Sequence, residues 1–212
     1  MICVSLGNIK VEDCLKLLPR LEMAEIRLDL MEVSLKDIGY LFSSHPCLIA
    51  TCRQGKYPEE ERRRFLLEAI EAGAAYVDLD LESDESLRPD VRHKARASGC
   101  RLLLSFHDFH KTPAAFELHN IIDRAFKLGA DLAKIACFSQ TPRDNARLLG
   151  LLVDSRPIVV CGLGPLGRAT RVAAPLCGSP FTYASWENTT PTAPGQMNHH
   201  FLRLLLRMIE HV

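Results

Sequence analysis

The chain has no net charge, no long apolar run and no paired-cysteine motif, and each absence excludes a class of protein. Its 26 basic and 26 acidic side chains cancel, so nothing indicates binding to nucleic acid or to an anionic membrane surface. No apolar run approaches the length of a membrane span, and the start MICVSLGN lacks the basic beginning and apolar core of a signal peptide. We therefore expect a cytoplasmic protein without a nucleic-acid or membrane partner.

The eight cysteines occur without any CxxC spacing. Five of them lie in or beside apolar, strand-like runs, namely Cys3, Cys47, Cys52, Cys137 and Cys161. Small buried thiols in a reducing compartment fit this placement better than a disulfide framework or a zinc site. His110, His199 and His200 also have no carboxylate or cysteine at ligand spacing, so we expect no bound metal.

Short apolar runs alternate with stretches of helical spacing along the whole chain. The strand-like runs cover residues 2–6, 24–30, 47–53, 76–81, 101–106, 132–138, 157–163 and 181–185. Helical stretches such as 58–74 and 112–130 follow them. Regular alternation of this kind predicts a parallel sheet covered by helices, and eight repeats predict a compact (β/α)8 barrel that occupies residues 1–212 as one domain. A doubly wound open sheet is the alternative.

Residues 162–167, GLGPLG, favour the open sheet, because they match the dinucleotide-binding pattern GxGxxG directly after a strand-like run. Glu187 even lies near the place where a ribose-binding carboxylate is sought. The motif belongs to the seventh of eight units, however, and Pro165 lies inside the would-be turn. We therefore interpret these glycines as a flexible loop at the end of the seventh strand and expect no nucleotide cofactor.

Polar side chains recur on one face of several predicted strands, where alternation turns them toward the barrel interior. These side chains are, strand by strand, Glu25, Arg27 and Asp29; Thr51 and Arg53; Asp78 and Asp80; Ser105 and His107; and Lys134. Internal ion pairs are the structural interpretation of such residues. So many titratable groups near the carboxyl ends of barrel strands are more typical of an active site.

Lys134 lies in the apolar run DLAKIACF and is the most informative of these residues. In a structural role its side chain would reach water from the end of the strand, whereas in a catalytic role its neutral amine would be a nucleophile. His107 ends the neighbouring strand, and strands lie about 4.8 Å apart, so both side chains can reach one small molecule. An amine converts a ketone to a protonated imine, and a histidine can move the adjacent proton to a leaving hydroxide. The residues predict elimination or carbon–carbon cleavage beside a carbonyl, without metal or cofactor.

Six short motifs occur in a fixed order along the chain. They are EIRLD at 25–29, TCR at 51–53, SFHDF at 105–109, LAKIA at 132–136, GRATR at 167–171 and TAPGQ at 192–196. Together they resemble the type I 3-dehydroquinate dehydratases of the shikimate pathway, which are (β/α)8 barrels. The resemblance implies that Lys134 forms a Schiff base with the ketone of 3-dehydroquinate, that His107 is the general acid and base, and that the products are 3-dehydroshikimate and water.

The same resemblance implies further site residues and partners. The implied substrate contacts are Ser5, Glu25, Arg27, Arg53, Arg171, Thr192 and Gln196. Arg171 would hold the substrate carboxylate, and the TAPGQ loop would fold over the hydroxyls. The resemblance also implies a homodimer and, as in some members, fusion to or partnership with a shikimate dehydrogenase.

The chain departs from the family pattern after its third predicted strand. Relatives carry a glutamate followed by two glycines where this chain has KYPEE at 56–60. The glutamate that helps to position the histidine is therefore either missing or supplied by Glu59 or Glu60. The first strand also begins without the N-terminal hairpin of some relatives. Two other functions stay open from the residues alone, namely a Schiff-base aldolase acting on a sugar phosphate and a non-catalytic barrel that binds a small acid or a partner protein.

Overall fold

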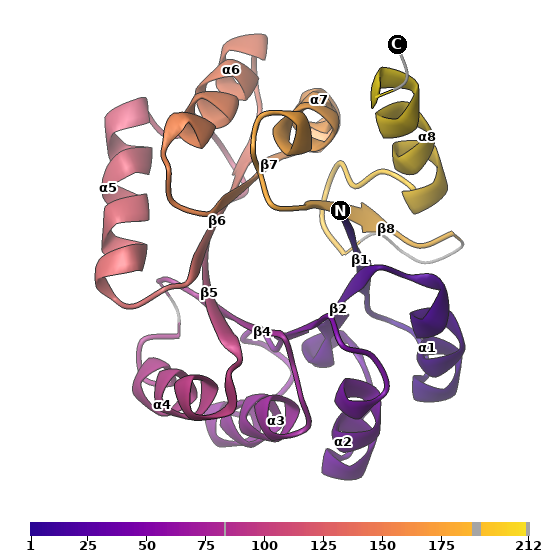
Figure 1. Cartoon of the computed structure of the whole chain (residues 1–212). Helices are drawn as coiled ribbons and strands as arrows, with labels where there is room; N and C mark the ends of the chain where they lie inside the picture. Colours follow the sequence, from indigo (N-terminus) through magenta and orange to yellow (C-terminus); the bar gives the residue numbers. More distant parts are fainter. Residues whose placement is uncertain (83, 188–191, 211–212) are drawn as a thin grey trace.

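The computed structural model describes residues 1–82, 84–187 and 192–210 as a ring of parallel strands surrounded by helices (Figure 1). The strands are β1 (Ile2–Leu6), β2 (Met23–Arg27), β3 (Leu48–Thr51), β4 (Tyr76–Asp80), β5 (Arg101–Asp108), β6 (Leu132–Phe138), β7 (Ile158–Leu163) and β8 (Thr182–Ser185). The helices are α1 (Val11–Leu17), α2 (Leu35–Ser43), α3 (Glu59–Glu71), α4 (Arg88–Ser98), α5 (Ala115–Lys127), α6 (Pro142–Gly150), α7 (Gly164–Leu176) and α8 (His199–Glu210). Short 3-10 turns are η1 (Leu18–Arg20), η2 (Leu28–Leu30) and η3 (Leu151–Val153).

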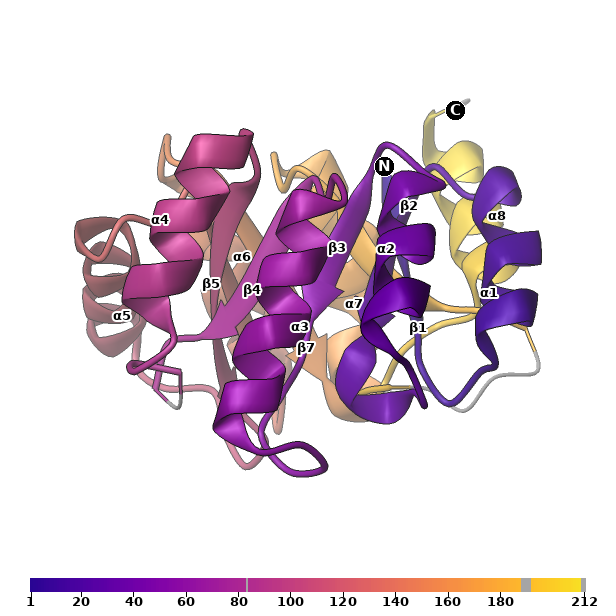
Figure 2. The ribbon, with the colours of Figure 1, turned by 90° about the horizontal axis from the view of Figure 1, so that it is seen from below.

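The strands form one sheet in the order β7-β6-β5-β4-β3-β2-β1-β8, with every neighbouring pair parallel. β7 and β8, at the two ends of that order, contact each other, so the sheet nearly closes on itself. Parallel neighbours need crossover connections, and the helices that supply them stand outside the strands (Figure 2). The (β/α)8 prediction is confirmed, and the doubly wound alternative is wrong. Within the described residues, no helix is long and apolar enough to cross a membrane.

Alternation along the strands separates an apolar layer under the helices from a smaller one inside the barrel. In β6, Ala133, Ile135 and Cys137 pack in the outer layer, whereas Leu132 and Ala136 pack in the inner one. The residues of the inner layer are Cys3, Met23, Ile49, Leu103, Leu132, Ala136, Val159, Cys161, Leu163, Phe181 and Tyr183.

Polar residues replace apolar ones at the next inward position of several strands. Two residues after an inner apolar residue come Ser5, Glu25, Thr51, Ser105 and Lys134, following Cys3, Met23, Ile49, Leu103 and Leu132 respectively. On these five strands the inner apolar residue therefore lies nearer the amino end, and the buried polar residue lies nearer the carboxyl end. A compact apolar floor beneath polar side chains is the arrangement that a barrel active site requires.

Residues 162–167 are not the flexible loop that we expected from the sequence. β7 continues to Leu163, and α7 begins at Gly164. A Cβ atom added to Gly167 would lie 2.3 Å from the carbonyl carbon of Gly162, so both glycines are needed for the close approach of helix and strand. Packing between β7 and α7 explains the glycine pattern without a nucleotide.

The eight cysteines are free thiols, as expected. Six of them are buried, Cys47 is half-buried and Cys177 is exposed. Burial raises the pKa of several of these thiols, to about 12 for Cys52 and Cys137, so they remain protonated at neutral pH. Their role is to fill space in the core.

Candidate active site

A cavity of about 340 Å³ lies at the carboxyl ends of the strands. Eight of the nine site residues expected from the sequence line it, namely Glu25, Arg27, Arg53, His107, Lys134, Arg171, Thr192 and Gln196. The ninth, Ser5, does not line the cavity; its hydroxyl donates a hydrogen bond to Glu25 and accepts one from Thr192 at 2.7 Å. The structure thus brings all nine residues to one end of the barrel.

Lys134 is largely enclosed, because only 8% of its side chain is exposed, and it lines the cavity. Its Nζ lies 3.3 Å from Asp78 Oδ2 and 3.6 Å from Glu25 Oε1. The same atom lies 4.2 Å from the centre of the Tyr183 ring, on the ring face. Two carboxylates and an aromatic face stabilise a positive charge at Nζ, which an ammonium and a protonated imine both carry.

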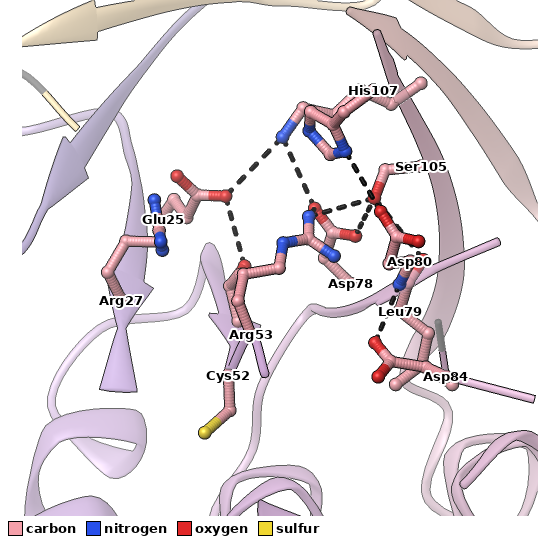
Figure 3. A network of polar contacts seen from close by, with 12 residues as sticks. Glu25, Arg27, Cys52, Arg53, Asp78, Leu79, Asp80, Asp84, Ser105 and His107 are labelled. Carbon is pink, nitrogen blue, oxygen red and sulfur yellow. Dashed lines mark hydrogen bonds and ion pairs between the residues drawn. The ribbon is translucent and has the colours of Figure 1, made fainter. Parts of the chain in front are cut away.

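Asp78 links the lysine to two neighbouring strands (Figure 3). Its Oδ2 accepts a 2.7 Å hydrogen bond from Arg53 Nη2, and its Oδ1 accepts one of 2.6 Å from Ser105. Burial alone would raise the pKa of Asp78, but the charges of Arg53 and Lys134 outweigh it and hold this pKa at about 2. Asp78 is therefore a permanent negative charge beneath the cavity at neutral pH.

Glu25 is the second carboxylate beside the lysine. It accepts hydrogen bonds from Ser5 and, at 3.1 Å, from Thr51. Burial acts to raise the pKa of Glu25, but Lys134 and Arg27 prevail and lower it. Glu25 also stays ionised, so the amine lies between two fixed anions.

The segment that contains TAPGQ closes one side of the cavity. Arg27 donates two hydrogen bonds to Asp29, of 3.0 and 2.6 Å, and its Nη1 lies 3.5 Å from the carbonyl oxygen of Thr192. The backbone N–H of Thr192 donates to Gln196 Oε1 at 2.8 Å. Gly195 supplies the turn between them with a φ of +80°, which favours glycine. This segment presents a hydroxyl and an amide to the cavity.

Arg171 reaches the cavity from α7 and is 1% exposed. Its Nη1 donates to the carbonyl oxygen of Tyr183 at 3.3 Å, and its Nε has no partner among the described residues. A buried guanidinium with an unused donor suits a carboxylate ligand, because Arg binds carboxylates through several N–H groups. Its role in binding the substrate carboxylate stays a prediction from the resemblance.

His107 lies beside Lys134 on the neighbouring strand β5. Its Nδ1 is 3.2 Å from Asp80 Oδ2, and its ring stacks on Phe109 with centroids 5.9 Å apart and planes at 9°. Burial lowers the pKa of His107 and outweighs the opposite effect of Asp80. The ring is therefore neutral at neutral pH, as a general base must be.

Of the two alternatives left open by the sequence, the structure favours a missing carboxylate after β3, because Glu59 and Glu60 pair with Arg63 instead of His107. Both lie in the first turn of α3, exposed, where they face Arg63 at 3.5 and 3.3 Å. The carboxylate that contacts His107 is Asp80, at the end of β4. The alternation of side chains along this strand predicts that Asp80 points into the barrel, but it does not predict a contact with His107.

Four residues of the site have no role predicted from the sequence, namely Asp78, Asp80, Tyr183 and Phe109. Asp78 and Asp80 were assigned only a direction, and Tyr183 was not singled out at all. Alternation in FTYAS would have turned Tyr183 inward together with Phe181, so that signal was present. Phe109 gave no such signal, because it follows the last residue of β5 and its stacking depends on the path of the chain beyond the strand.

The fold and the cavity define an enzyme of the (β/α)8-barrel class with a buried lysine and a histidine at its carboxyl end. A family model described as type I 3-dehydroquinase matches residues 2–212. The 3-dehydroquinate dehydratase of Methanococcoides burtonii is 36% identical over 201 residues, covering 89% of this chain and 85% of that protein. That of Methanococcus vannielii is 31% identical over 221 residues, covering 99% and 100%. A solved 3-dehydroquinate dehydratase from Geobacillus kaustophilus has a TM-score of 0.86 at 26% identity, covering 99% of this chain and 91% of that chain.

The chain belongs to the type I 3-dehydroquinase family. Its activity is that of a 3-dehydroquinate dehydratase, a hydro-lyase of the shikimate pathway. The function implied by the ordered motifs is thereby confirmed over the aldolase and the non-catalytic barrel.

Proposed function

We propose that the protein removes water from 3-dehydroquinate through an imine on Lys134, with His107 as general acid and base. The observation that carries this proposal is the position of Lys134 Nζ, enclosed between Asp78, Glu25 and the Tyr183 ring beside His107. A lysine in a merely structural role would not need a cavity above it or a neutral histidine on the adjacent strand.

The reaction follows from these two side chains. The neutral amine of Lys134 attacks the ketone carbon, and the adduct takes up one proton from solvent and loses one water to leave a protonated imine. That proton returns to solvent when the imine is hydrolysed. The imine acidifies the adjacent C–H bond, and His107 takes that proton to give an enamine. The enamine expels hydroxide, which receives the proton from His107 and leaves as water. A water molecule then hydrolyses the imine and releases 3-dehydroshikimate, so the net change is the loss of one water.

Substrate binding is assigned to the charged and polar groups that line the cavity. Arg171 holds the carboxylate with its unused donor, while Thr192 and Gln196 contact hydroxyl groups. Arg53 also has a buried donor, Nη1, without a partner among the described residues. Ser5, Glu25 and Arg27 support this surface through the hydrogen bonds described above. The imine is itself the electron sink, so the scheme requires no metal and no cofactor.

Three wider assignments complete the proposal. Residues 1–212 act as one catalytic domain. Side chains from both ends of the chain support this assignment, because Ser5 and Gln196 are joined through Thr192 in one hydrogen-bond network. The protein works in the cytoplasm, where its free thiols would stay reduced. Partnership with a shikimate dehydrogenase stays a prediction from the resemblance.

We also propose a homodimer, formed through the outward face of α8. Phe201, Leu204 and Met208 lie on one side of this helix by their spacing, and each is more than half exposed. The opposite side buries Leu202 and Leu206 against the barrel. An apolar stripe left outside the core is typical of a surface that meets a protein partner, and we assign a second copy of the chain to it because the family resemblance implies a homodimer.

The direct test is turnover of 3-dehydroquinate by the purified protein, followed by the absorbance of the conjugated enone and by mass spectrometry of the product. We expect 3-dehydroshikimate, and we expect the same rate after treatment with EDTA. Absence of product with folded protein, or strict dependence on an added metal, would contradict the proposed reaction.

A further inference from the structure

We propose that Asp80 is the positioning residue of His107 and replaces, from the neighbouring strand β4, the carboxylate that is missing after β3. The inference rests on the proposed function, in which His107 moves the proton. The register pairs Asp80 with Ser105, two residues before His107, so the histidine side chain lies beside the end of β4. The resulting distance between His107 Nδ1 and Asp80 Oδ2 is 3.2 Å (Figure 3).

The carboxylate of Asp80 is itself held in place. Its Oδ1 accepts a 3.0 Å hydrogen bond from the backbone N–H of Glu82, which leaves Oδ2 directed at the histidine. The backbone N–H of Asp80 donates to Asp84 Oδ2 at 2.9 Å, and the backbone N–H of Asp84 donates in return to the Asp80 carbonyl oxygen at 3.2 Å. Hydrogen bonds to its side chain and to its backbone therefore restrict the orientation of Asp80.

A buried ion pair links Asp84 to α3 and to the end of β3. Arg62, from α3, pairs with Asp84, and both side chains are at most 2% exposed. The same guanidinium donates two hydrogen bonds, of 3.0 and 2.8 Å, to the carbonyl oxygen of Cys52, the residue before Arg53. One arginine therefore holds the ends of both β3 and β4, and with them Arg53 and Asp80.

The consequence for His107 is a fixed tautomer. With Asp80 as acceptor, Nδ1 carries the hydrogen, and Nε2 keeps the lone pair that takes the substrate proton. Four charged groups face the ring from neighbouring strands, namely Asp78 and Asp80 of β4, Arg53 after β3, and Lys134 of β6. The two cations and burial disfavour the imidazolium, whereas the two carboxylates favour it. Asp80 thus orients the base and raises its proton affinity against the larger, opposite effect of burial.

The test compares Asp80→Asn and Asp80→Glu with the wild-type protein, with Glu82→Gln as matched control. Glu82 lies two residues after Asp80, and Glu82→Gln removes one negative charge, as Asp80→Asn does. The carboxylate of Glu82, however, pairs with Arg124 and not with His107. For each protein we would measure kcat/KM for 3-dehydroquinate against pH, and trapping of the substrate on Lys134 by borohydride.

We expect Asp80→Asn to lower kcat/KM about 10- to 100-fold, in the range found for groups that orient a catalytic histidine. Because a carboxylate that favours the imidazolium is lost, the acidic limb of the profile should move to lower pH. Trapping on Lys134 should persist, Asp80→Glu should recover most of the rate, and Glu82→Gln should behave as wild type.

Two results would overturn the role of Asp80. One is an Asp80→Asn protein with the wild-type rate and profile, and the other is loss of trapping in parallel with the rate, which would indicate a general structural effect. If the wild-type protein itself neither turned over nor trapped 3-dehydroquinate, the proposed function would fail instead, and the two failures are distinguishable.

Discussion

Lys134 is tolerated in a buried strand because two carboxylates and the face of an aromatic ring surround its Nζ. Asp78 and Glu25 are fixed as anions by Arg53, Ser105, Ser5 and Thr51, so each carboxylate already has hydrogen-bond donors. Removing one partner from a buried ion pair lowers the free energy of unfolding by about 3–5 kcal/mol, so each member of the network stabilises the others. In the proposed reaction, the protonated imine on Lys134 carries its positive charge within the same set of contacts.

At the residue scale, alternation along the strands was enough to direct Lys134 and His107 into the barrel. It could not show which carboxylate would meet which cation. That pairing depends on the stagger between adjacent strands, which places Ser105 opposite Asp80 and Lys134 opposite Ser105. Whether a carboxylate then reaches a given cation depends on the lengths of the two side chains. A single sequence does not show how far adjacent strands are staggered.

Replacement of His107 by alanine should separate imine formation from elimination. We expect kcat to fall by about 10²- to 10⁴-fold, the usual contribution of a general acid–base group, while Lys134 still forms the imine. Steady-state rates and borohydride trapping measure the two steps. His110→Ala changes an exposed histidine nearby and should leave both unchanged. Full activity in His107→Ala would remove the histidine from the mechanism.

At the scale of elements, the eight strands could be located from apolar runs, but their ends could not. The run 24–30 was expected to be a single strand, whereas β2 stops at Arg27 and η2 follows. Its alternation therefore breaks before Asp29, which turns back to bind Arg27. Hydrogen bonds between side chains only two residues apart end the alternation here, although the apolar pattern continues to Leu30.

The junction of β7 and α7 gives a prediction at the same scale. Gly167→Ala would place a Cβ against the backbone of Gly162, so we expect a loss of about 1–3 kcal/mol in the free energy of unfolding. Gly150→Ala is the matched control, because no atom lies within 4 Å of its Cβ position and its φ is −60°. Gly150→Ala should leave the free energy of unfolding unchanged or raise it by about 0.4–1 kcal/mol. Urea unfolding measures both, and equal stability of the two variants would contradict close packing as the reason for the glycine pattern.

At the scale of the whole molecule, the buried carboxylates should make stability depend on pH. The pKa of Asp78 in the folded protein, about 2, lies below that of an unfolded aspartate, about 3.9, and the pKa of Glu25 is also lowered. Their stabilisation is fully present above the unfolded pKa and is lost as pH falls toward 2. Urea midpoints at pH 7, 4 and 2.5 should therefore decrease in that order. A midpoint unchanged between pH 7 and pH 2.5 would mean that these carboxylates do not contribute.

The association state is the second property at this scale. If the α8 stripe joins two copies, Leu204→Glu combined with Met208→Glu should convert a dimer to a monomer in light scattering, without loss of the barrel. Val153→Glu alters another exposed apolar residue, on η3, and should leave the dimer intact. A wild-type protein that is monomeric at assay concentrations would exclude the dimer.

The most direct measurement of the central claim is the intact mass of the protein after mixing with 3-dehydroquinate and borohydride, followed by peptide mapping. Borohydride reduces an imine to a stable amine, so we expect a gain of one ligand-sized mass on the peptide that contains Lys134. Lys134→Met should show no gain under the same conditions. An adduct on another lysine, or none on a wild-type protein that turns over the substrate, would contradict the account of Lys134 as the nucleophile.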